Sequence, residues 1–302
     1  MKAGISDSGD CPNGVSFEEE TTVSIGELQV TEASLARGGY RSGWAQRVRV
    51  IALNTFRESV RDRVLYNLIL FVLILVAASV FVSDLSLNME SQFTAALGLS
   101  VMLVFGALIA IFIGVGLVYK EIDKRTIYNL LSKPVRREEF IFGKYFGLCM
   151  TLFVNSIVMV VGTELALLYV NHGFVPLQLA VLPAAYLIYL ELSLLVGVAL
   201  MFSSFTTPML AALFSFAAYA IGHLSGDLRQ AAQLSDSVVI RGVLTTLYYL
   251  LPNLSNFGFI AEASHGRMLP LRMAVQATIY AVVYIGILLS ASALIFQRRN
   301  FK

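Results

Sequence analysis

Long apolar segments dominate the pattern of residues along this chain. Five of them come close to or exceed the length of about 20 residues that an α-helix needs to cross the hydrocarbon core of a bilayer. They cover residues 65–82, 97–119, 145–170, 179–202 and 274–296. A sixth apolar segment, 209–221, is shorter and follows Pro208. By itself the sixth segment is compatible with a span or with a buried or re-entrant helix, so hydropathy alone predicts five or six transmembrane helices.

The positions of Lys and Arg decide between these counts, because basic residues collect in cytoplasmic loops. They are frequent before the first apolar segment, between the second and the third, and after the last. By contrast, the connections 83–96 and 171–178 contain no Lys or Arg. Both chain ends and the loop 120–144 are therefore expected in the cytoplasm. Two cytoplasmic ends require an even number of spans, which favours six.

Composition agrees with a membrane protein. The chain is 57% hydrophobic and 14% charged, whereas soluble domains are roughly 45–50% apolar and about 25% charged. This balance excludes a disordered protein, a basic nucleic-acid-binding protein and a small disulfide-rich secreted module, and it argues against a soluble enzyme. Cys11 lies in a polar region and Cys149 in an apolar one, so no disulfide framework is expected.

The first 43 residues differ from the rest. Residues 1–43 are polar and acidic, with three successive glutamates at 18–20, a composition that cannot bury enough apolar surface to fold readily. We therefore predict a disordered cytoplasmic leader over 1–43 and a membrane domain over 44–302. A small folded module in the leader is the alternative.

An amphipathic helix is predicted over residues 44–64, directly before the first span. Val48, Ala52, Phe56 and Val60 recur at helical spacing, and Arg57 and Arg61 fall on the other side. Such a helix lies at a membrane interface and would bend into the first span. The alternative is that its basic residues act only as a topology signal.

The sequence of the cytoplasmic loop 120–144 predicts a helix, a break and a second helix. Glu121 and Arg125 have the four-residue spacing that supports a helix, and Pro134 cannot continue it but suits the start of the next one. Interleaved apolar residues argue against a purely solvated loop. A short rigid element of this kind could transmit force from a soluble partner. The residues proposed for that contact are Glu121, Arg125, Lys133, Pro134, Arg136 and Arg137.

The segment 223–273, expected on the outer side, is too long for a plain connection. Its apolar part 238–251 mixes hydrophobic residues with Arg241 and Thr245. It could enter the outer leaflet as a short helical hairpin or lie flat at the interface, with Tyr248 and Tyr249 among the headgroups.

Two kinds of residue stand out inside the predicted spans. Glu164 and Glu191 are ionisable groups in apolar segments, which are costly in a bilayer and suggest a function such as contact with substrate or proton transfer. A purely structural hydrogen bond is the alternative for each. Gly106, Ala110 and Gly114 recur every four residues, a spacing that allows close helix packing.

Motifs for enzymatic or metal chemistry are not found. Gly143-Lys144 is followed by Tyr145, and Glu138 stands where the first glycine of a phosphate-binding loop would be. We therefore predict no catalytic residue and no cofactor in this chain. Residues on the outer side with metal-ligand chemistry lack the close spacing of a binding motif, so no metal site is predicted. They are His223, Asp227, His265, Met268 and Met273.

Over residues 44–302 the chain resembles the permease subunit of ABC-2 type transporters. The most specific piece is the stretch Leu-Leu-Ser-Lys-Pro-Val-Arg-Arg at 130–137 in the cytoplasmic loop. The resemblance also rests on Glu121, Glu191 and the stretches 54–58, 61–62, 125–126, 139–140, 143–145, 202–204 and 250–253. It implies an all-α membrane fold like that of type V exporters: six transmembrane helices, an elbow helix before the first and a coupling helix between the second and third.

The resemblance also implies a function and partners. Two permeases, either two copies or one copy and a paralogue, would pair and bind two ATPase subunits that carry ATP and Mg. The chain would then be the permease of an ATP-driven exporter that works by alternating access in the cytoplasmic membrane of a bacterium. Glu164 and Glu191, selected above because an acid is costly in a bilayer, are the candidates for a translocation path. The alternatives are an ion-coupled secondary carrier that uses these two acids and a membrane factor for metal-site maturation.

The charge asymmetry generates a test of topology. Cysteines placed at Asn88 and Gln233 should react in intact cells with a thiol reagent that does not cross membranes, and one placed at Ser132 should not. Labelling of the Ser132 position alone would show that the chain is inserted in the opposite orientation.

Overall fold

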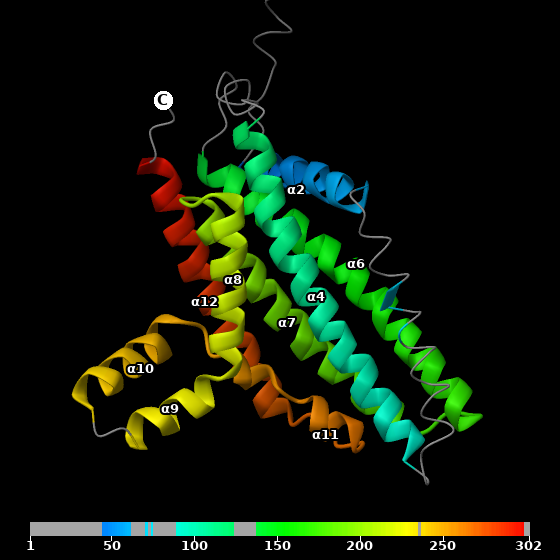
Figure 1. Cartoon of the computed structure of the whole chain (residues 1–302). Coiled ribbons are helices and arrows are strands. Elements are labelled where there is room, and N and C mark those ends of the chain that lie inside the picture. The colour runs from blue at the N-terminus through cyan, green and yellow to red at the C-terminus, as the bar shows by residue number, and fades with distance from the viewer. Residues whose placement is uncertain are drawn as a thin grey trace, which may run out of the picture. The chain divides into compact units, whose positions relative to one another are not determined.

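The computed structural model describes residues 44–61, 70–71, 74, 89–123, 137–234 and 237–298, and all of them belong to one compact unit from Trp44 to Lys302. Every regular element within these residues is a helix. The described part of the chain is therefore all-helical, as the sequence predicts (Figure 1). The leader 1–43, most of the first predicted span 65–82 and the loop 124–136 lie outside the described residues.

Four of the described helices are long and apolar enough to cross a membrane. They are α4 (Glu90–Asp123), α6 (Arg137–Asn171), α7 (Leu177–Ser203) and α12 (Leu271–Arg298). Each contains one of the predicted spans and extends beyond it at both ends. The fifth apolar helix, α8 (Pro208–His223), has 16 residues and is about 24 Å long, which is less than the roughly 30 Å hydrocarbon core. The chain is thus a helical membrane protein, and the count of six spans stays a prediction.

Helix α7 lies at the centre of this unit, where α4, α6, α8 and α12 all pack against it (Figure 1). Of its most apolar stretch 72% is buried, compared with 28% for α12. A helix that is apolar on all sides can be stable only when neighbours or lipid surround it. The sequence of α7 is apolar on nearly all sides, and Glu191 is its one ionisable carboxyl group.

Small residues let α4 approach α7 closely. A Cβ atom at Gly106 would lie 2.3 Å from Cδ1 of Leu192, and one at Gly114 would lie 3.1 Å from Cβ of Ala199. Ala110 between them is 2% exposed. The close packing that the four-residue spacing predicts is therefore confirmed, and its partner is α7.

Helix α2 (Trp44–Arg61) packs across the first turns of α6. A Cβ atom at Gly143 would lie 2.6 Å from Cβ of Ile51, and one at Gly147 would lie 2.6 Å from the backbone oxygen of Ala52. The two backbones thus meet at a pair of glycines four residues apart. A helix was predicted over 44–64 and is present, whereas its location at a membrane surface stays a prediction.

The opposite end of the bundle from α2 carries the segment between α8 and α12 (Figure 1). Helices α9 (Ser225–Leu234) and α10 (Val238–Leu250) pack against each other as a hairpin. The chain then returns through η1 (Leu254–Phe257) and α11 (Ile260–Ser264), which contact α7. Helix α10 coincides with the apolar segment 238–251, and α9 was not predicted.

The crossing of α2 and α6 generates a prediction about stability. Gly147→Ala should destabilise the protein by about 1–3 kcal/mol, because an added methyl group in a tightly packed contact forces neighbours to move, and here the neighbour is backbone. The purified protein should aggregate at a lower temperature. Gly286→Ala on α12 is the matched control, since a Cβ atom there meets nothing within 4 Å. Equal effects of the two changes would contradict the close crossing.

Candidate functional site

A buried carboxyl group lies in the middle of the central helix. The Glu191 side chain on α7 is 1% exposed, and its Oε1 lies 2.8 Å from Nε2 of His223. His223 is the last residue of α8. Because α8 is shorter than α7, its C-terminal end lies beside the middle of α7 and can place an imidazole there. The pair supplies one polar contact inside an otherwise apolar helix interface.

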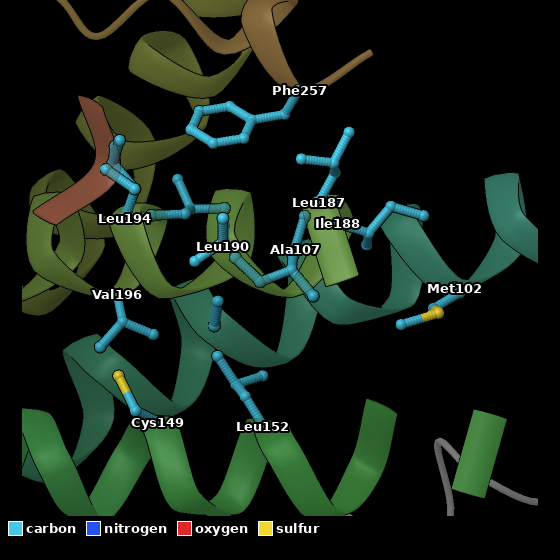
Figure 2. Close-up of a cluster of buried hydrophobic side chains, with 14 of the residues drawn as sticks. Met102, Ala107, Cys149, Leu152, Leu187, Ile188, Leu190, Leu194, Val196 and Phe257 are labelled. Carbon is cyan, nitrogen blue, oxygen red and sulfur yellow. The ribbon is translucent and has the colours of Figure 1, made fainter. Parts of the chain in front are cut away.

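The surroundings of this pair are unequal on its two sides. On the α7 side Leu187, Leu190 and Leu194 gather with Phe257 of η1 in an apolar cluster (Figure 2). On the α8 side the His223 side chain keeps 31% of its surface exposed. Its ring packs edge-on against Tyr219, with 4.7 Å between the ring centroids. Glu191 is therefore closed off from solvent, while its partner is partly open to the surroundings of the bundle.

Polar contacts continue directly after His223 and connect three elements. The Ser225 hydroxyl donates to Oδ1 of Asn253 at 2.6 Å, and the backbone N–H of Asn253 donates to the Tyr280 hydroxyl of α12 at 2.8 Å. At Gly222 a Cβ atom would lie 2.9 Å from the Pro252 backbone oxygen. The Pro252-Asn253 pair therefore joins the end of α8 to the start of η1 and to α12.

Glu164, the other predicted acid, has a different environment on α6. Its Oε1 is buried and has no hydrogen-bond partner. The backbone oxygen of Glu164 lies 3.5 Å from Nε2 of Gln178, a buried residue at the start of α7. No hydrogen bond joins Glu164 to Glu191 in the described part of the chain. The structure thus places the two acids on different helices with separate neighbours and does not combine them in one cluster.

Buried charges also accompany the crossing of α2 and α6. Nη2 of Arg47 lies 2.9 Å from Oε1 of Glu139, whose side chain is 1% exposed. Nζ of Lys144, with its side chain 2% exposed, lies 3.7 Å from Oε2 of Glu58 and 5.7 Å from the centre of the Phe140 ring. Sequence reasoning did not select these residues as a site. The available signal in the sequence was the position of Glu139 and Lys144 near Gly143 and Gly147, since glycines four residues apart indicate a close helix contact.

The residues predicted for coupling lie mostly beyond the described ranges. Arg125, Lys133, Pro134 and Arg136 fall within 124–136. The helices α4 and α6 include Glu121 and Arg137, respectively. On α2, Arg57 is exposed and Arg61 is the final residue.

The residues with metal-ligand chemistry are distributed over several elements. Among the described residues, no group of three or more His, Cys, Asp or Glu side chains is placed to hold a metal ion. His223 contacts Glu191, and Nδ1 of His265 lies 2.7 Å from the backbone oxygen of Ala261. The two histidines are thus engaged in separate local contacts.

Comparison with known protein families gives one match. Residues 49–300 match the family model described as "ABC-2 family transporter protein". The matched range contains the whole of α4 to α12 and most of α2. No curated protein matches the chain.

The buried charges at the α2–α6 crossing generate a prediction about coupling between residues. Arg47→Ala and Glu139→Ala should each destabilise the protein, and the double variant should lose less than the sum, with an interaction energy of about 1–3 kcal/mol because the two groups are in direct contact. The temperature of aggregation of the purified protein measures all three variants. Arg49→Ala, which removes an exposed arginine of the same helix, is the control and should have little effect. Strict additivity would show that the contact contributes nothing.

Proposed function

Because this chain belongs to the ABC-2 transporter family, and is thus a permease component of an ABC transporter, we propose that it exports a substrate across the cytoplasmic membrane by alternating access. The observation that carries the proposal is the family match over 49–300, which includes every long apolar helix that the structure describes. Charge asymmetry along the sequence supports the orientation, with both chain ends in the cytoplasm.

ATP hydrolysis, in this proposal, takes place on two separate ATPase subunits that bind ATP and Mg. The Gly143-Lys144 pair supports this assignment, since it has a packing role that leaves no room for a nucleotide. A Cβ atom at Gly143 would lie 2.6 Å from Ile51, and the Lys144 side chain is 2% exposed beside Glu58. The ATPases would bind a pair of permeases, either two copies of this chain or this chain and a paralogue.

Force from the ATPases would enter through the loop between α4 and α6, at Glu121, Arg125, Lys133, Pro134, Arg136 and Arg137. Helix α6 begins where this loop ends, and its first turns carry the contacts to α2. Those contacts combine backbone packing at the glycines with the Arg47–Glu139 ion pair. A displacement of the loop would therefore move the start of α6 and α2 together. This rigid connection is what we expect of an elbow helix.

The translocation path is proposed to pass Glu191 and Glu164. Glu191 is the more strongly supported of the two, since a carboxyl group buried at the centre of a helical membrane protein is costly and by default suggests a function. Its contact with His223 lies at the point where a short helix ends inside the bundle. Such interrupted helices give polar groups access to the interior of a membrane protein.

The proposed coupling is tested by charge reversal in the loop. Glu121→Lys should weaken co-purification of the ATPase subunit, because a wrong charge in a partly desolvated interface costs about 2–5 kcal/mol. Glu90→Lys is the matched control, as it makes the same change at the other end of α4. Pro134→Ala should leave co-purification closer to normal and lower the transport obtained per ATP hydrolysed, because it would relax the break that the sequence predicts in the loop.

The readouts are recovery of the ATPase with the permease and the ATP hydrolysis rate of the reconstituted complex. Native recovery and native hydrolysis in Glu121→Lys would rule out the coupling role of the loop. A native chain that recruits no ATPase would rule out the proposed function itself.

A further inference from the structure

Five elements meet where α8 ends, namely α7, α8, α9, η1 and α12, and polar contacts connect them. We call this region the α8 junction and define it as Gly222, His223, Ser225, Asn253 and Ser255. It contacts α7 through the His223–Glu191 pair and α12 through the hydrogen bond from the Asn253 backbone to Tyr280. Asn253 also caps the start of η1, because its Oδ1 accepts a hydrogen bond from the backbone N–H of Ser255 at 3.1 Å. These directional contacts are set in an interface that is otherwise apolar.

The apolar part of the same interface closes this end of the bundle. Leu254 and Phe257 of η1 are each 1% exposed and belong to the same buried cluster as the leucines of α7. Figure 2 shows Phe257 beside Leu187, Leu190 and Leu194. The returning chain can come this close because residue 222 is glycine: a Cβ atom there would lie 2.8 Å from Cγ of Leu254. Any path that opens along α7 at this end must move η1 away from it, and α8 ends against the same segment.

Stability of the fold does not by itself explain the Glu191–His223 pair. A pair of well-packed apolar side chains stabilises a buried interface at least as well as a buried ion pair in many proteins. What a carboxyl–imidazole contact at 2.8 Å adds is dependence on the distance between the two groups, so that a small shift of one helix weakens it strongly. Packed interfaces tend to have discrete alternative arrangements, and a contact of this kind can select one of them.

Exposure indicates how the contact could separate. The His223 side chain is 31% exposed, whereas that of Glu191 is 1% exposed. When α8 moves away, the imidazole already borders the surroundings of the bundle, so little else must rearrange on its side. The carboxyl group gains water only if the interface between α7 and α8 opens. The centre of α7 can therefore be hydrated only when the contact between Glu191 and His223 is broken.

We propose that the Glu191–His223 contact is a latch that holds the α8 junction and η1 against the middle of α7. When the latch is closed, Leu254 and Phe257 cover α7. When it breaks, the end of α8 and η1 move away and expose Glu191 to the translocation path. This inference rests on the proposed function, because a latch of this kind has a role only in a protein that opens a path.

The test measures access to a cysteine behind the latch, in the full-length permease purified into lipid nanodiscs without any ATPase. Ala218 lies on α8 in the buried cluster and is 3% exposed. We would introduce Ala218→Cys into a background with Cys11→Ser and Cys149→Ala, and measure its rate of labelling by a water-soluble maleimide. In nanodiscs both faces of the protein meet the reagent, so the result does not depend on topology.

Labelling should be slow with the native pair and about tenfold faster in Glu191→Leu and in His223→Leu, which corresponds to a change of about 1.4 kcal/mol in the opening equilibrium. Glu191→Gln keeps a polar side chain of the same length against His223 and should stay close to the native rate. Tyr186→Phe is the matched control, since it removes another contact of α7, the 2.9 Å hydrogen bond between its hydroxyl and that of Thr278 on α12. Native labelling rates in both leucine variants, or an equal increase in Tyr186→Phe, would overturn the latch.

A second measurement covers the case in which the leucine variants do not fold. Glu191→Asp keeps the carboxyl group but shortens the side chain by one methylene, so its oxygen no longer reaches Nε2 of His223, which is 2.8 Å from Oε1 in the native protein. This small change should be tolerated by the fold, and labelling of Ala218→Cys should again be about tenfold faster, which corresponds to about 1.4 kcal/mol. A native labelling rate in a folded Glu191→Asp variant would overturn the latch. If the native complex hydrolyses no ATP, the proposed function fails, and the labelling test of the latch still stands.

Discussion

The carboxyl group of Glu191 constrains the arrangement of the helices around α7. In a bilayer no water is available to a buried polar group, so the protein must supply the partner itself. The partner here is His223, and it reaches Glu191 because α8 ends beside the middle of α7. A full-length α8 would continue past this point with side chains that need not be polar. The short α8 in turn leaves space at its end, which η1 fills with Leu254 and Phe257.

At the other end of the bundle, backbone packing and ion pairs together hold α2 against α6. There α2 and α6 approach until their backbones are in contact at Gly143 and Gly147. Glu139, before the glycines, and Lys144, between them, form ion pairs with α2, of which Arg47–Glu139 is the closer. Backbone packing fixes the crossing point of the two helices, and the ion pair adds a second point of attachment. Together they tie α2 to the start of α6, which is what the proposed route of force from an ATPase requires.

Parts of the fold follow from the sequence because they depend on local properties. The spans within α4, α6, α7 and α12 follow from hydropathy, since each long apolar segment must be helical in a bilayer regardless of its neighbours. The close approach at Gly106 and Gly114 follows from their spacing on one helix face. Helix α9 was missed because it has only ten residues and most of them are not strongly apolar. It packs against α10, which no local pattern reveals.

Two features can be derived without any coordinates: this is a helical membrane protein, and Glu191 is a costly group on an apolar helix. Both follow from the transfer energies of single residues and segments. The partner of Glu191 could not be derived in this way, because His223, weighed from the sequence as a metal ligand, meets Glu191 only through the packing of α8 on α7. Likewise, Gly143 and Lys144 belong by sequence to the cytoplasmic loop and to the family resemblance, and the structure places them against α2. The physical reason is the same in both cases. Contact energies depend on which two helices face each other, and the spacing of residues along one helix does not specify the helix that packs against it.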